Sequence, residues 1–255
     1  YHRPRGIISH GSEEPNGLVE VINDHYNEPN TKITTLELYE GLKAKSQNCW
    51  PSVKFDLMSI NDKLSNFISA GFYYKTFMWP SSFWEKIYEP MIRKAAGLGS
   101  LSLSNSGRNS EKGFLHCDVL IIGSGPSGLV SAYIAGLSGA RVLLVEEDFV
   151  FGGSLNNETF TISDMSAQNW VKFIIKDLNK LTNVKLMKKT EIIGMFDHGI
   201  FGAIEKNKYK KIDQIFWKIT TKKTLLCSGS TERLIPFQNN DLPGIMLSNS
   251  IRSFV

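Results

Sequence analysis

The feature that most restricts how this chain can fold is Gly123-Ser124-Gly125-Pro126-Ser127-Gly128, which fits the pattern GxGxxG. A continuous apolar run, residues 117–123, precedes the motif, and an Ala/Leu-rich stretch, residues 127–137, follows it. The first run predicts a strand that is buried on both faces, and the second predicts a helix. Strand, glycine turn and helix in this order are the context that a dinucleotide-binding loop requires.

Each glycine of the motif has its own steric reason. Gly123 permits the tight turn, Gly125 leaves room for a pyrophosphate against the backbone, and Gly128 lets the helix lie close to the strand. The amides and the dipole at the helix start stabilise the diphosphate charge. Pro126 suits the first helical turn, where its missing N–H removes little. The predicted phosphate-binding residues are Gly123, Gly125, Pro126, Ser127 and Gly128.

An acidic residue closes the next strand. Glu146 follows the apolar run 141–145, where a carboxylate can accept hydrogen bonds from the adenosine ribose. Glu147 and Asp148 add negative charge that would repel a 2′-phosphate, so the site favours NAD or FAD over NADP. The same kind of site serves both of these nucleotides. A glycine turn that binds no ligand is the purely structural alternative.

Two later segments are typical of flavoprotein folds that bind two dinucleotides. Gly152-Gly153-Ser154 resembles their paired glycine near the diphosphate, and Cys227-Ser228-Gly229 stands in place of their Ala-Thr-Gly segment. Between these segments the pattern predicts a helix over 167–181 and a turn at 197–199. It also predicts a series of strands at 184–187, 191–195, 200–205, 215–220 and 223–227. The fold class is therefore α/β, with a Rossmann-like domain and a β-meander.

The polar, Ser/Asn/Gly-rich residues 100–113 read as a linker, which separates a region at 1–99 from one at 114–255. The first region is β-rich, which makes the chain α+β overall. Its predicted elements are strands at 7–9, 18–22 and 34–39, turns at 14–17 and 27–30, and a helix at 83–96.

An aromatic stretch, residues 71–90, ends the first region. Its rings belong to Phe72, Tyr73, Tyr74, Phe77, Trp79, Phe83, Trp84 and Tyr88. Lys75, Pro80 and Glu85 interrupt the stretch, so it cannot span a bilayer. It also lacks the interleaved Arg and Lys of a base-stacking channel. We expect either a buried packing plate or an interface, and the sequence does not separate the two.

Composition excludes several other functions. The formal net charge is +4, from 29 basic and 25 acidic residues spread along the chain. The Lys-rich run at 206–211 reads as a solvated hairpin face, so we expect neither nucleic acid nor membrane as a partner. Cys49, Cys117 and Cys227 lie far apart, which supports no metal site or iron–sulfur cluster and fits a reducing cytoplasm. We expect structural roles for the histidines and for the cysteines at strand ends, and we assign no catalytic residue.

The chain also carries distinctive sequence words: YHRPRG (1–6), EEPNGLVEV (13–21), SQNCWPS (46–52), FDLMSIND (55–62), AGFYYKTFMWP (70–80), FWEKIYEPMIRKAAGLG (83–99) and NNDLPGIM (239–246). In these words the chain resembles the alpha subunits of heterotetrameric sarcosine oxidase, in their N-terminal portion. Opine dehydrogenase and hydrogen cyanide synthase subunits are similar but less close.

The resemblance implies a partial ferredoxin-like β-grasp unit without a cluster, followed by an NAD-binding domain. Its phosphate loop corresponds to Gly123, Gly125, Ser127 and Gly128. Further correspondences are Glu146 and Glu147 at the ribose, Ser154 after the paired glycine, and Ile192 beside the adenine. It implies NAD in this chain and FAD and FMN elsewhere in a complex with beta, gamma and delta subunits.

That complex would demethylate sarcosine to glycine, passing the one-carbon unit to tetrahydrofolate and electrons to oxygen. The resemblance also predicts a folate-binding half that these 255 residues do not include, and a dinucleotide domain that is incomplete at its C-terminus. We therefore expect the chain by itself to be inactive. Two alternatives stay open: an FAD-binding subunit like that of opine dehydrogenases, and a non-catalytic remnant or scaffold.

Overall fold

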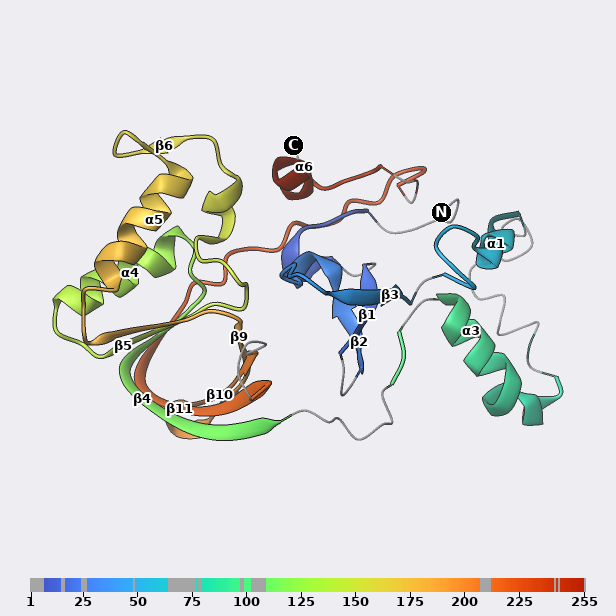
Figure 1. Ribbon diagram of the computed structural model, residues 1–255, viewed down its shortest axis with the longest axis horizontal. Coiled ribbons are helices and arrows are strands. Elements are labelled where there is room, and N and C mark those ends of the chain that lie inside the picture. Colours follow the sequence, from blue (N-terminus) through green and yellow to red (C-terminus); the bar gives the residue numbers. More distant parts are fainter. Residues whose placement is uncertain are drawn as a thin grey trace. The chain divides into compact units, whose positions relative to one another are not determined.

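The computed structural model describes residues 7–14, 17–23, 27–47, 49–63, 77, 79–96, 99–101, 109–206, 212–240, 242 and 244–254. The chain divides into two compact units, each described below by itself: one of Tyr1–Gly107 with Arg233–Ile251, the other of Arg108–Glu232 with Arg252–Val255 (Figure 1). Helices and strands occur in both, which confirms the predicted mixed α/β class.

The second unit is built on one sheet in the order β8-β5-β4-β11-β10-β9. Its strands are β4 (Ser110–Ile122), β5 (Val142–Val145), β8 (Val184–Met187), β9 (Thr190–Phe196), β10 (Ile200–Lys206) and β11 (Gln214–Leu226). Neighbours from β8 to β11 pair in parallel, while β11, β10 and β9 form an antiparallel meander. The sheet curls strongly at the meander (Figure 1).

The strand β11 runs further than its sequence suggests. It pairs with β4 from Gln214 opposite Ser110 to Leu226 opposite Ile122. The strands expected at 215–220 and 223–227 are therefore one element, because a single parallel partner holds both in register. The strand β4 begins at Ser110, inside the expected linker of 100–113, and residues 102–108 of that linker lie outside the described part.

Both faces of this sheet are covered, as its apolar strands predicted. Helices α4 (Pro126–Leu137) and α5 (Ala167–Leu178) lie on one face (Figure 1). The helix α5 begins where the Ser166 hydroxyl accepts from the Asn169 amide, and it buries the stripe Ala167, Val171, Ile174 and Leu178. On the opposite face, the meander contributes Phe201, Ala203 and Ile219 to a second cluster with Leu120 and Leu143.

Short segments complete the second unit. The turn Gly153–Asn157 is a 3-10 helix, and β6 (Thr161–Ile162) pairs with β7 (Met165–Ser166). Between β9 and β10, the turn Asp197–Gly199 places His198 at φ 62°, so the predicted turn is present.

The first unit contains an antiparallel sheet in the order β2-β1-β3. Its strands are β1 (Leu18–Ile22), β2 (Asn27–Lys32) and β3 (Lys43–Ser46). The turn expected at 27–30 is wrong, because Asn27 and Glu28 pair with β1. The strand expected at 34–39 is also wrong. A 3-10 turn, Ile33–Thr35, stands at its start, and the Thr35 hydroxyl donates to the Lys32 carbonyl.

Helices and a returning segment make up the rest of this unit. They include α1 (Ile60–Lys63), a π-helical turn (Trp84–Tyr88) and α3 (Glu89–Ala96), which together realise the helix expected at 83–96. Residues 233–251 group here and not with the dinucleotide domain expected at 114–255. The contact is a parallel bridge, in which the Ile8 amide donates to Ile245 and Leu247 donates back to Ile8 (3.0 and 2.8 Å). The helix α6 (Ser248–Phe254) follows that bridge.

The aromatic stretch is only partly described, since Phe72, Tyr73 and Tyr74 lie outside the described residues. Trp79 is 85% exposed and Phe83 is 44% exposed, while the Phe77 and Tyr88 rings pack at a tilt of 44° with centroids 5.0 Å apart. Among the described rings of the stretch, Trp79 and Phe83 are therefore exposed, while Phe77 and Tyr88 contact each other. In the described part of the chain, no helix has the length and apolarity that crossing a bilayer requires.

Candidate dinucleotide-binding site

The predicted phosphate loop joins β4 to α4. Gly123 has φ +97°, and a Cβ there would overlap the Cys227 carbonyl oxygen. A Cβ on Gly128 would overlap the Gly123 carbonyl oxygen, so both positions require glycine. A Cβ on Gly125, in contrast, would meet no atom within 4 Å. The turn is closed on its inner side and open at Gly125, as a cradle for a phosphate must be.

The start of α4 is suited to an anion. Gly125 is the N-cap and has no side chain to accept from the first amides, and Pro126 occupies the first turn. Pro126 and Ser127 are exposed, so this helix end is accessible. Free amides and the positive end of the dipole then face solvent beside the open side of Gly125. The residues present fit a bound diphosphate.

Glu146 lies at the carboxyl end of β5 and is tied to the loop. Its Oε2 accepts from the Ser124 amide (2.8 Å) and from the Ser124 hydroxyl (2.6 Å), and its Oε1 accepts from the Asp148 amide (3.1 Å). The Glu146 side chain is 9% exposed, whereas Glu147 is exposed. The ribose acid predicted from the sequence is therefore held against the phosphate loop.

The paired glycine also reaches this loop. A Cβ on Gly153 would lie 3.1 Å from the Gly125 Cα, and the Gly152 amide donates to the Ser124 hydroxyl (3.1 Å). Gly153 and Ser154 are exposed at the start of their 3-10 turn. The strand end at Glu146 and the paired glycine thus both meet the phosphate loop at Ser124, 22 and 28 residues away in sequence.

The remaining predicted site residues, Ile192 and Gly229, lie on segments that border the phosphate loop and Glu146. The Thr190 amide donates to the Glu146 carbonyl (2.8 Å), so β9 starts beside the ribose acid, and Ile192 follows half-buried against the second core cluster. The Cys227 amide donates to the Ile122 carbonyl (2.7 Å), which places the end of β11 beside the loop. Gly229 follows, exposed and with φ +74°.

Sequence reasoning gave no role to Ser124. Ser124 was passed over because the second position of GxGxxG accepts many residues, yet here it is fully buried and connects the other parts. A hydroxyl between the first two glycines of the motif, followed by an acid at the next strand end, is the signal that could have identified it.

Cys117 and Cys227 are poorly suited to act as nucleophiles. Burial raises the pKa of the Cys117 thiol and of the Cys227 thiol, which makes each a poorer nucleophile. This agrees with their predicted structural roles. No cluster of three or more potential metal ligands occurs among the residues that the structure describes.

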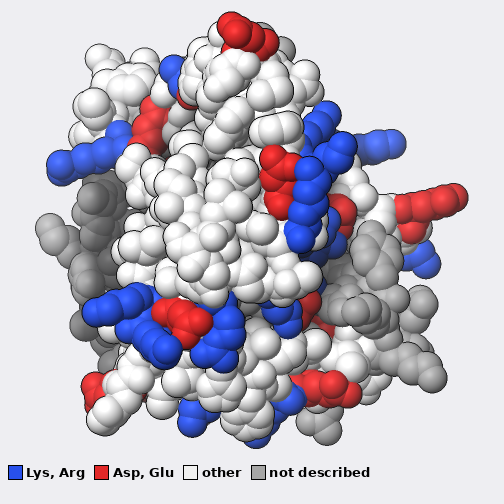
Figure 2. All heavy atoms as spheres, turned by 90° about the vertical axis from the view of Figure 1, so that its left-hand side faces the viewer, with Lys and Arg blue, Asp and Glu red and all other residues white. Residues whose placement is uncertain are grey.

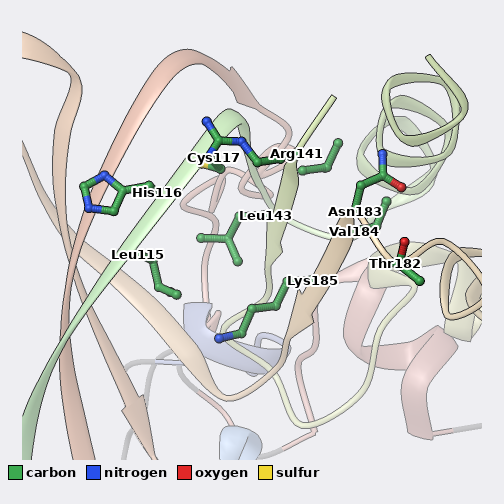
Figure 3. A pocket seen from close by; sticks show the side chains of 10 residues that line it. Leu115, His116, Cys117, Arg141, Leu143, Thr182, Asn183, Val184 and Lys185 are labelled. Atoms are coloured by element: carbon green, nitrogen blue, oxygen red, sulfur yellow. The ribbon is translucent and has the colours of Figure 1, made fainter. Parts of the chain in front are cut away.

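A separate cavity of about 160 Å³ lies at the amino ends of β5 and β8, away from the phosphate loop (Figure 3). His116 and Cys117 line it from β4, Leu143 from β5 and Lys185 from β8. The nearby Arg141 guanidinium is paired with Asp118 (3.1 Å), and the Lys185 ammonium lies 5.0 Å from the centre of the Trp217 ring. This hollow is not part of the dinucleotide site.

Surface charge is mixed on the face drawn in Figure 2, where basic and acidic side chains form small groups around uncharged surface. The second unit also contains close ion pairs such as Lys180–Asp177 (2.6 Å). That face therefore lacks the single-sign field that a nucleic-acid surface needs.

These features define a dinucleotide-binding domain of the flavoprotein type. Comparison agrees: residues 118–212 match the family described as FAD dependent oxidoreductase, and residues 1–49 match a 2Fe-2S iron-sulfur cluster binding domain.

More particularly, the chain is a homologue of sarcosine oxidase alpha subunits. It is 45% identical over 263 residues to the Rhizobium meliloti sarcosine oxidase subunit alpha, with 100% of this chain and 26% of that protein covered. The Corynebacterium sp. (strain U-96) subunit alpha is 29% identical over 99% of this chain and 22% of its own length. The resemblance seen in the sequence is confirmed, and homology places the chain among oxidoreductases. It spans about a quarter of these curated relatives.

Among solved structures, L-proline dehydrogenase from P. horikoshii is 26% identical, with a TM-score of 0.43, over 56% of this chain and 28% of that one. Thioredoxin reductase from Lactococcus lactis is 25% identical, with a TM-score of 0.37, over 47% of this chain and 37% of that one.

The iron–sulfur match does not extend to the ligands of a cluster. A [2Fe-2S] cluster is held by four cysteines or by cysteines with histidines, and residues 1–49 contain one cysteine, Cys49. The remaining two, Cys117 and Cys227, belong to the other unit. The residues present do not supply the ligands of a cluster.

Proposed function

We propose that this chain is the NAD-binding portion of a sarcosine-oxidase-like alpha subunit. The observation that carries the proposal is the phosphate cradle, open at Gly125 and closed by required glycines at Gly123 and Gly128. Glu146, Glu147 and Asp148 place negative charge at the ribose end, which disfavours a 2′-phosphate and hence NADP. The choice of NAD rests on the resemblance to the alpha subunits.

The chain's own residues would act by binding and orienting. Amides at the start of α4 hold the diphosphate, and Glu146 accepts from a ribose hydroxyl. Gly153 and Ser154 lie beside the loop, where they would line the diphosphate, while Ile192 would lie beside the adenine. Gly229 would border the loop from the end of β11. A bound dinucleotide supplies two-electron transfer.

The complete protein would work in a complex. We propose partners corresponding to beta, gamma and delta subunits, with FAD and FMN in the assembly, and a cytoplasmic location. The assembly would demethylate sarcosine to glycine and pass the one-carbon unit to tetrahydrofolate and the electrons to oxygen. Support comes from the homologues named sarcosine oxidase subunit alpha, matched along the entire chain.

A second candidate is FAD at the same site, as in an opine-dehydrogenase-like amine dehydrogenase. The match of residues 118–212 to FAD dependent oxidoreductases favours it. A remnant that retains assembly surfaces without turnover is the third candidate, and it predicts no bound nucleotide.

The test begins with acid release of nucleotide from natively purified protein, identified by chromatography and absorbance. Protein that carries none is titrated with NAD and with FAD, and Gly125→Trp serves as the control because its side chain would fill the cradle. NAD binding that this substitution abolishes supports the proposal. A yellow protein loaded with FAD supports the second candidate, and binding of neither nucleotide contradicts both.

A further inference from the structure

We propose that Ser124 is a positioning residue, which fixes the Glu146 carboxylate for reading the adenosine ribose. The proposal rests on the proposed dinucleotide function and adds a residue to that site. Ser124 is the variable second position of the glycine motif, between Gly123 and Gly125, where no side-chain function was expected.

Burial determines how Ser124 can act. Its side chain has no exposed surface, so it cannot touch a ligand in the open cradle beside Gly125. A buried hydroxyl needs hydrogen-bond partners, and Ser124 has them on both sides. Its Oγ donates to Glu146 Oε2 (2.6 Å) and accepts from the Gly152 amide (3.1 Å).

The hydrogen bond from the Ser124 hydroxyl to Glu146 is of a strong type. A hydroxyl that donates to a carboxylate forms a short, charge-assisted hydrogen bond, and the Ser124 amide reinforces it at 2.8 Å on the same oxygen. The carboxylate is therefore fixed in rotation as well as in position before any nucleotide arrives. Preorganisation of this kind lowers the entropic cost of binding.

The remaining hydrogen-bonding capacity of Glu146 indicates what it can read. A carboxylate offers about four acceptor positions. Oε2 uses two of them on Ser124, and Oε1 uses one on the Asp148 amide (3.1 Å). One position on Oε1 is left, which matches a single ribose hydroxyl. Loss of the Ser124 hydroxyl would leave Oε2 with the Ser124 amide as its one partner on this serine, and the carboxylate could then rotate away from that geometry.

Ser124 also joins the ribose acid to the paired-glycine turn. The Gly152 amide donates both to the Ser124 hydroxyl and to the Ser124 carbonyl (3.1 Å each). The adjacent Gly153 lies against Gly125. Diphosphate and ribose recognition therefore share one buried serine.

The experiment measures dinucleotide affinity by calorimetry in the full-length protein that carries this chain. Ser124→Ala is expected to weaken binding of the native dinucleotide about tenfold. It should leave binding of an analogue with 2′,3′-dideoxyadenosine unchanged, because the analogue offers Glu146 no hydroxyl. In a Glu146→Gln background, Ser124→Ala should have little further effect.

Two further variants keep the test decisive. Ser124→Cys retains the side-chain volume with a weaker donor and should give a smaller loss, and it replaces Ser124→Ala if that variant fails to fold. Ser138→Ala removes a hydroxyl that donates to the Ile134 carbonyl at the far end of α4, and it should bind as the parent does. Equal weakening toward the native dinucleotide and the dideoxy analogue would mean general damage to the loop and would overturn the positioning role. Parent protein that binds neither NAD nor FAD would instead overturn the proposed function.

Discussion

The two units differ in how much apolar surface they bury by themselves. In the unit of Arg108–Glu232, Leu120, Leu144 and Leu178 have no exposed surface, and both faces of the sheet are packed. Among the described residues of the other unit, the buried apolar side chains are Ile7 and Val21, while Trp50, Phe55 and Trp79 are largely exposed.

This difference in burial shows where the local sequence pattern is enough to predict the structure. Where strands and helices satisfy each other, as around β4 and α4, the local pattern and the final structure agree. Large exposed apolar side chains are typical of interaction surfaces. The following predictions test this contrast, starting with the largest expected effect.

The largest effect is expected from a substitution at the close contact between α4 and the phosphate loop. Gly128→Val introduces a side chain where even a Cβ overlaps the Gly123 carbonyl, so we expect a loss of more than about 3 kcal/mol in the free energy of unfolding. Chemical denaturation followed by circular dichroism measures it.

Gly125→Ala is the matched control, because its Cβ meets no atom within 4 Å and its φ of −63° suits alanine. It should keep the parent stability and lose dinucleotide affinity. Gly128→Val protein as stable as the parent would contradict the close packing of α4 on β4.

A smaller effect is expected at the opposite edge of the same sheet. Arg141 donates to Asp118 from both side chain and backbone, and Lys222 lies 2.9 Å away, which together hold the pKa of Asp118 well below its usual range. Because the folded pKa is the lower one, this stabilisation is complete above about pH 5. It is lost progressively as the pH falls through the unfolded value of about 3.9 toward the folded one.

Asp118→Asn should therefore lower the melting temperature near pH 7, and its difference from the parent should shrink as the pH falls below about 5. Thermal melts across a pH series measure this. A difference independent of pH would contradict the paired carboxylate.

The smallest effect is expected in the exposed aromatic segment. Trp79→Ala removes a side chain that is 85% exposed and should change the free energy of unfolding by less than about 0.5 kcal/mol. Phe77→Ala, which removes the ring whose centroid lies 5.0 Å from that of Tyr88, is the contrasting variant and should lower the free energy of unfolding by more. A large loss for Trp79→Ala, measured by denaturant titration, would place that ring in a core and remove the contrast between the units.

The sequence predicted the dinucleotide unit well because its signals are local. The run before Gly123 and the stripe along α5 each report burial directly, and the acid at Glu146 follows its strand. The sequence failed at 27–32, where pairing with β1 made a strand of turn-forming residues, and at 34–39, where a 3-10 turn stands at the start of the expected strand. It also could not give the long pairing of β11 with β4 or the contacts of Ser124, since each joins residues far apart in the chain.

The length of β11 has a consequence for how the protein is made. Its partner β4 is the first strand of the unit, and paired residues such as Ser110 and Gln214 are 104 positions apart. The turn at Gly123 is closed by Cys227, which follows β11, so the nucleotide cradle cannot be finished until synthesis has passed that residue. Contacts at such separation form slowly. On the ribosome, β4, α4 and β5 must wait with one edge of the sheet unpaired, and a chaperone would have its greatest influence during that interval.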